Sequence, residues 1–75
     1  MEKQRVEITT EYIPLGQFLK LAGVIDTGGQ AKMILADVPI QVNGETENRR
    51  GKKLYNGDIV DVEGFGTFEI VKGAE

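Results

Sequence analysis

The chain of 75 residues contains no cysteine and no histidine. Without cysteine, neither a disulfide nor a thiolate metal site can hold the fold, so packing and regular hydrogen bonding must stabilise it. Without histidine, no side chain titrates near neutral pH at its ordinary pKa. Without cysteine, the strongest soft nucleophile is also missing. We therefore expect a protein that is not an enzyme, with no catalytic residues, no metal, no cofactor and no small-molecule substrate.

The sequence also lacks a long hydrophobic run. Its apolar stretches are only a few residues long, whereas a membrane-spanning helix needs about 20 apolar residues. Residues 1–5 lead into alternating residues rather than into an apolar run, so no secretory signal is expected. Because a chain this short buries only about 60% of its unfolded surface, it can form one domain with a modest core. We expect a single domain over residues 1–75, located in the cytoplasm and not on a membrane.

Positive charge is scarce but concentrated. The chain carries 12 carboxylates against 9 cations, a net charge of -3. Even so, four of the cations, Arg49, Arg50, Lys52 and Lys53, fall within five positions. Such a cluster on an acidic chain indicates contact with a polyanion. Glu45, Glu47 and Asn48 precede the cluster, and we expect them not to neutralise it position by position. The simpler alternative is a solvated loop kept soluble by its charge.

Two segments show apolar residues at helical spacing. A first helix is predicted over residues 15–22, with Pro14 favouring its first turn and Gly23 ending it. A second helix is predicted over residues 30–36, with Thr27 as its N-cap. The exposed face of the first helix then carries Gly16, Gln17 and Lys20.

Strands are predicted where polar and apolar residues alternate. Asn43-Gly44 is a strong hairpin signal because both turn positions need a positive φ, and Asn56-Gly57 repeats it. The order of strand, two helices, then three or four strands predicts an α+β domain with a mainly antiparallel sheet. The predicted strands are residues 5–9, 40–42, 59–63 and 67–71.

Five blocks in this order and spacing resemble the S4 RNA-binding domain, and within it the small stand-alone bacterial S4-like proteins of the YaaA type. The resemblance spans about residues 12–64. It implies an S4-like (αL motif) fold, in which two short helices pack on a small, mainly antiparallel sheet, here with extra N- and C-terminal strands. The blocks are Leu15-Gly16-Gln17-Phe18-Leu19-Lys20, Gly28-Gly29-Gln30-Ala31-Lys32-Met33-Ile34, Ile40-Gln41-Val42-Asn43-Gly44-Glu45, Arg49-Arg50-Gly51-Lys52-Lys53 and Gly57-Asp58-Ile59-Val60.

The resemblance also implies that RNA is held against the helix pair and the adjoining basic loop. One departure is visible: S4 domains often carry a Ser-Arg pair at the start of the second helix, where this chain has Thr27-Gly28. Independently of the family, a helix N-terminus with glycines lets a phosphate approach free N–H groups; alternatively, Gly28-Gly29 only relieves strain in a tight turn. The matching positions are Gln17 and Lys20, then Thr27, Gly28, Gly29, Gln30 and Lys32, then Arg49, Arg50, Lys52 and Lys53.

These observations predict a module that docks on structured RNA through phosphate contacts. The expected partner is ribosomal RNA, a ribosomal subunit or a ribosome-assembly particle. The alternative is a protein–protein adaptor that has lost RNA binding, in keeping with the absent arginine, and that uses the sheet edge around residues 67–71. Tyr55 and Phe65 could each stack on a base, although covering an edge of the small core is the favoured interpretation for both.

Overall fold

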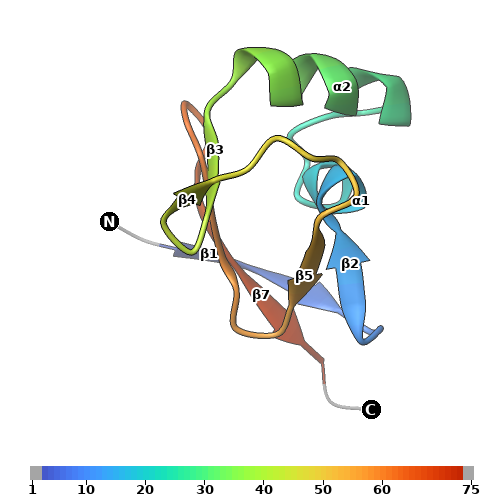
Figure 1. The fold of residues 1–75 in the computed structure, drawn as a ribbon. Helices are drawn as coiled ribbons and strands as arrows, with labels where there is room; N and C mark the ends of the chain where they lie inside the picture. Colours follow the sequence, from blue (N-terminus) through green and yellow to red (C-terminus); the bar gives the residue numbers. More distant parts are fainter. Residues whose placement is uncertain (1–2, 74–75) are drawn as a thin grey trace.

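The computed structural model describes residues 3–73, so residues 1–2 and 74–75 of the predicted domain lie outside the described residues. The described part forms two helices and seven strands (Figure 1). The helices are α1 (Leu15–Leu21) and α2 (Gly28–Asp37). The strands are β1 (Lys3–Ile8), β2 (Tyr12–Pro14), β3 (Ile40–Val42), β4 (Glu45–Thr46), β5 (Lys53–Tyr55), β6 (Ile59–Val62) and β7 (Gly66–Lys72).

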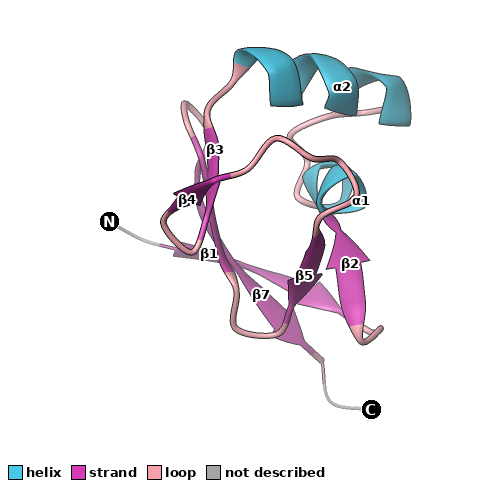
Figure 2. Cartoon of the chain, viewed as in Figure 1, coloured by secondary structure: helices cyan, strands magenta, loops and turns pink. Residues whose placement is uncertain are grey.

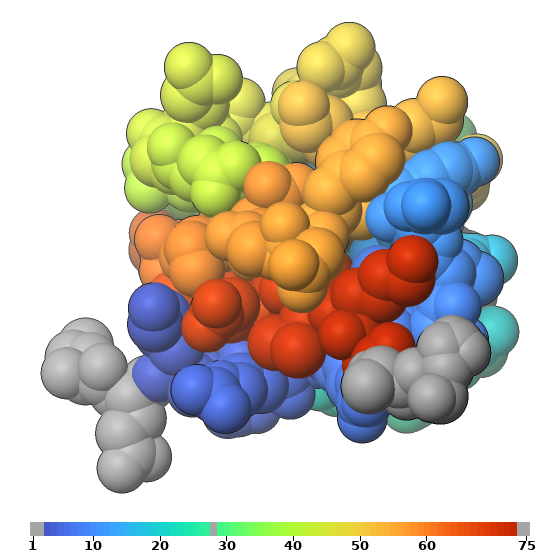
Figure 3. Space-filling model, turned by 90° about the horizontal axis from the view of Figure 1, so that it is seen from below, coloured from blue at the N-terminus to red at the C-terminus, as the bar shows by residue number. Residues whose placement is uncertain are grey.

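The strands form two sheets. Five of them pair in the order β1-β7-β6-β3-β4, and β2 and β5 form a separate antiparallel ribbon. Within the larger sheet β1 and β7 are parallel, whereas the other three pairings are antiparallel. Figure 3 shows β7 lying alongside β1, and Figure 2 shows both helices together at one end of the strands. The predicted α+β class with a mainly antiparallel sheet is confirmed.

The core lies between the helices and both sheets. Leu15 and Phe18 from α1, Leu54 from β5 and Ile70 from β7 have no exposed surface. The ring of Phe18 meets that of Phe68 at a centroid distance of 5.6 Å and an interplanar angle of 82°, an edge-to-face contact that joins α1 to β7. Each such side chain contributes about 1.5–3 kcal/mol through burial, so α1 is held firmly in place.

The ends of α1 follow local backbone rules. Pro14 is the last residue of β2 and the N-cap of α1, with an extended backbone (φ -64°, ψ 146°), so α1 begins directly after it at Leu15, as predicted. At the other end Gly23 has φ 83°. The N–H of Gly23 donates to the carbonyl of Lys20 (3.1 Å), and that of Val24 to the carbonyl of Leu19 (2.9 Å). This Schellman motif confirms Gly23 as the stop.

One of the two predicted hairpin turns is correct. Asn43 and Gly44 both have positive φ, 54° and 87°, and join the paired strands β3 and β4. At Asn56-Gly57 only Gly57 has a positive φ, and the chain passes from the β2–β5 ribbon into the larger sheet. The hairpin expected there is therefore wrong. The carboxylate of Asp58 instead accepts the N–H of Tyr55 and holds a turn between two different sheets.

Three short strands, β2, β4 and β5, have no counterpart among the predicted strands. Each has only two or three residues, which is too short for alternation to be recognised in the sequence. Their positions depend on partners far along the chain, as the pairing of β2 with β5 illustrates. Within residues 3–73, no helix combines the length and the apolar character that crossing a membrane would need.

Candidate nucleic-acid interface

The basic loop, residues 49–53, is bonded to the start of α1. The N–H of Leu15 donates to the carbonyl of Lys52 (2.8 Å), and the N–H of Gly16 donates to the carbonyl of Arg50 (2.9 Å). The first N–H groups of a helix have no partner within the helix, and Pro14 at the N-cap makes no side-chain hydrogen bond to them. The loop therefore caps α1 through its own carbonyls, and in Figure 1 it passes across the helix.

Gly16 lets the Arg50 side chain lie directly against α1. A Cβ atom at Gly16 would overlap the Cγ of Arg50 and would come within 3.1 Å of its Cδ. Gly16 is buried although the helical pattern placed it on the exposed face, and that prediction is wrong because Arg50 covers it. A glycine inside a helix costs about 0.5–1 kcal/mol of stability relative to alanine. Its presence in the helical pattern could therefore have indicated that another segment packs closely against the helix at this position.

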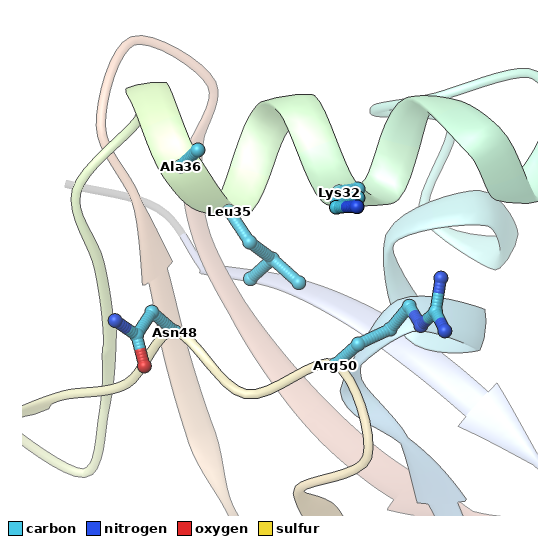
Figure 4. A pocket seen from close by; sticks show the side chains of 5 residues that line it. All are labelled: Lys32, Leu35, Ala36, Asn48 and Arg50. Carbon is cyan, nitrogen blue, oxygen red and sulfur yellow. The ribbon is translucent and has the colours of Figure 1, made fainter.

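Two open hollows adjoin at Arg50. The first is drawn in Figure 4, where Lys32 and Leu35 of α2 lie above the loop that carries Asn48 and Arg50. The second lies between α1, α2 and the loop. We call this pair the Arg50 hollows. Their linings are Lys32, Leu35, Ala36, Asn48 and Arg50 for the first, and Pro14, Gly16, Gln17, Lys20, Ala31, Arg50 and Gly51 for the second.

The structure brings together four of the residues that the sequence singled out: Gln17, Lys20, Lys32 and Arg50 line the Arg50 hollows. Three more, Arg49, Lys52 and Lys53, line a separate hollow on the neighbouring part of the basic loop together with Tyr55. Lys53 is also the first residue of β5 rather than a loop residue.

The sequence did not indicate that the apolar residues Ala31, Leu35 and Ala36 would line the Arg50 hollows. These residues appear in the sequence only as parts of a helix. Nothing in their spacing shows that the basic loop folds back against the same helix.

Arg49 is paired with an acid. Its Nε donates to Oε2 of Glu47 (2.9 Å) and its Nη2 to Oε1 (3.2 Å), while its backbone N–H donates to the same carboxylate (3.0 Å). The Arg49 guanidinium lowers the pKa of Glu47 to about 2. The expectation that Glu47 leaves the cluster unneutralised is therefore wrong. In contrast, Lys20, Lys32, Arg50 and Lys52 form no ion pair with any residue between positions 3 and 73.

A comparison with known families decides what kind of domain this is. A family model described as the S4 domain matches residues 6–71. The chain belongs to the S4 domain family. The predicted family is therefore confirmed.

Two relatives of this S4 domain are similar over most of their length. The "Probable ribosome maturation protein RlbA" of Bacillus subtilis (strain 168) is 58% identical over 66 residues, which are 88% of this chain and 93% of the relative. The "Putative RNA-binding protein YbcJ" of Escherichia coli (strain K12) is 34% identical over 53 residues, 71% of this chain and 76% of the relative.

The start of α2 in this S4 domain is organised by Gln30. Its Oε1 accepts the N–H of Asp26 (2.6 Å) and the N–H of Thr27 (3.2 Å), as the third residue of a capping box does. Thr27 has the extended backbone of an N-cap residue (φ -132°, ψ 160°), and α2 begins at Gly28, two residues before the predicted start. Thr27, Gly29 and Gln30 are exposed but line none of the three hollows described above.

Proposed function

We propose that this S4 domain is a non-enzymatic RNA-binding protein of the cytoplasm that docks on structured RNA of the ribosome or of a ribosome-assembly particle. One observation carries the proposal: the guanidinium of Arg50, which forms no ion pair within residues 3–73, lies between α1 and α2, and Lys20 and Lys32 line the same hollows. The names of the two relatives, one a ribosome maturation protein and the other a putative RNA-binding protein, support it.

The chemistry of the Arg50 hollows suits a sugar-phosphate backbone. A guanidinium can bind a phosphate with two parallel hydrogen bonds, and the lysines add flexible point charges. The exposed side chain of Ala36, which lines the first hollow, offers apolar surface against which a ribose can rest. Such contacts recognise the shape of a folded RNA more than its sequence.

The net charge of -3 does not oppose this role. Charges more than about 8 Å apart are largely screened at physiological salt, so a local group of cations acts despite distant carboxylates. The absence of histidine and cysteine from the sequence favours binding over catalysis, because the usual acid–base and nucleophilic groups are missing.

Binding to purified ribosomal RNA over a range of salt concentrations tests the proposal. If Lys20, Lys32, Arg50 and Lys52 each neutralise a phosphate, the logarithm of the affinity should fall with the logarithm of the salt concentration with a slope of about -3. Arg50→Ala should lower affinity about tenfold or more, the value of a charged hydrogen bond. It should also make the slope shallower by about 0.7–0.9.

Arg5→Ala is the matched control, since it removes the same charge from an exposed position on edge strand β1. Its affinity should stay within twofold of that of the unmodified protein, and its slope should be unchanged. Equal losses in the two variants would mean that net charge, and not the Arg50 hollows, governs binding. In pull-downs, partners that persist after ribonuclease treatment would instead favour a protein adaptor.

A further inference from the structure

The outer face of the β2–β5 ribbon carries two tyrosines and a lysine. Leu54 points into the core with no exposed surface, so its neighbours Lys53 and Tyr55 point outward from β5. Tyr12 of β2 is the cross-strand partner of Tyr55, with the ring centroids 5.9 Å apart and the rings inclined at 64°. The Nζ of Lys53 lies 5.1 Å from the centre of the Tyr12 ring, within cation–π range.

Tyr55 remains 49% exposed despite its contact with Tyr12. It borders the hollow that Arg49, Gly51, Lys52 and Lys53 complete, an open space of about 560 Å³. Of the three cations that line this hollow, Arg49 is paired with Glu47, whereas Lys52 and Lys53 form no ion pair within residues 3–73.

The backbone holds Tyr55 rigidly. Its N–H donates to the carboxylate of Asp58 (2.7 Å), and its carbonyl accepts the N–H of Asp58 (2.9 Å). Next to it, Leu54 anchors β5 in the core. With its backbone fixed and its ring in contact with Tyr12, the Tyr55 side chain has less conformational entropy to lose when a ligand stacks on it.

We propose that Tyr55 is a stacking site for an unpaired RNA base, with Lys52 and Lys53 contacting the phosphates beside that nucleotide. Aromatic rings flanked by cations are the usual means of holding a single unpaired base. Gly51 lines both this hollow and the second Arg50 hollow, so one strand can run from Arg50 across Gly51 to Tyr55. The inference rests on the proposed function and adds that the RNA must offer an unpaired base at this point.

Tyrosine fluorescence can report the stacking directly. The chain contains two tyrosines and no tryptophan, so in Tyr12→Phe the ring of Tyr55 is the sole tyrosine and the ring contact is kept. The probes are two RNA hairpins with the same stem, one with a single bulged adenosine and one fully paired. The bulged hairpin should quench the emission of Tyr12→Phe, and the paired hairpin should leave it nearly unchanged.

Affinity measurements complete the test. Tyr55→Ala should bind the bulged hairpin about fivefold or more weakly, the lower end of the stacking contribution of one base. Tyr55→Phe keeps a stacking ring and should bind it as the unmodified protein does, which separates stacking from a fold defect.

Two outcomes would overturn the inference, and only the second would also overturn the proposed function. If the protein binds ribosomal RNA but prefers neither hairpin, or if Tyr55→Ala keeps the preference, the stacking site is refuted and the proposed function stands. If the protein binds neither ribosomal RNA nor either hairpin, both fail together.

Discussion

Replacing Gly16 by alanine should separate the stability of this S4 domain from its RNA affinity. The new Cβ would overlap the Cγ of Arg50, which is close to the backbone, so the arginine side chain must rotate at its first torsion to escape. The Arg50 carbonyl, at 3.5 Å from the new atom, is at ordinary contact distance and can stay where it accepts the Gly16 N–H. We therefore expect the guanidinium to leave its place between α1 and α2 while the loop remains bound.

The two effects have opposite signs. Alanine is better than glycine inside a helix by about 0.5–1 kcal/mol, and moving an exposed side chain costs little, so the free energy of unfolding should stay the same or rise by up to about 1 kcal/mol. RNA affinity should fall about tenfold, or about 1.4 kcal/mol, because the proposed phosphate contact of Arg50 would be lost. Urea unfolding measures the first quantity and titration with ribosomal RNA the second.

A double-mutant cycle checks that Arg50 transmits the effect. In the Arg50→Ala background, Gly16→Ala should cause no further loss of affinity, which gives a coupling of about 1.4 kcal/mol. Gly29→Ala serves as the control for stability, since the nearest side-chain atom to its Cβ would be 3.9 Å away and nothing has to move. The reasoning is refuted if Gly16→Ala binds RNA like the unmodified protein, or if it weakens binding equally with and without Arg50.

Two further predictions concern stability. Because the Arg49 guanidinium lowers the pKa of Glu47 from 4.5 to about 2, the carboxylate contributes stability that is complete above pH 4.5 and lost as the pH falls towards 2. Near neutral pH, Glu47→Gln should unfold at a lower urea concentration than the unmodified protein. The difference in urea midpoint should shrink as the pH falls from 4.5 to about 2. A difference independent of pH would contradict the ion pair. Leu54→Ala should lower the free energy of unfolding by about 2–5 kcal/mol, because Leu54 is fully buried; in urea titrations a loss below about 1 kcal/mol would show that it is not a core residue.

Much of the fold could be predicted from local patterns. The helical spacing from Leu15 onward and the stop at Gly23 correctly indicated α1, and Asn43-Gly44 correctly indicated the β3–β4 turn. The wrong prediction of a hairpin at Asn56-Gly57 has a non-local cause. Asn56-Gly57 has the composition of a hairpin turn, but the strands on either side of it belong to different sheets, and no local pattern shows which partner a strand will choose.

The sequence named cations for the candidate site but gave no indication of how they are arranged. The sequence singled out Lys20, Lys32 and Arg50, and these line adjoining hollows. It treated Arg49 as equivalent to Arg50, although only Arg49 is paired with Glu47. That distinction depends on the directions of side chains in a loop, and these follow no repeating pattern in the sequence.

By itself, the sequence determined the α+β class, the two helices and the presence of one cationic cluster, because apolar spacing and local charge are properties of neighbouring residues. Only the tertiary structure decided which cations form ion pairs within the described part of the chain and what the others face. The carbonyls of Arg50 and Lys52 bond to the start of α1, more than 30 positions earlier in the chain, and this contact carries the Arg50 side chain across Gly16. A site of that kind is created by closing a long loop, and its geometry exists only after the chain has folded.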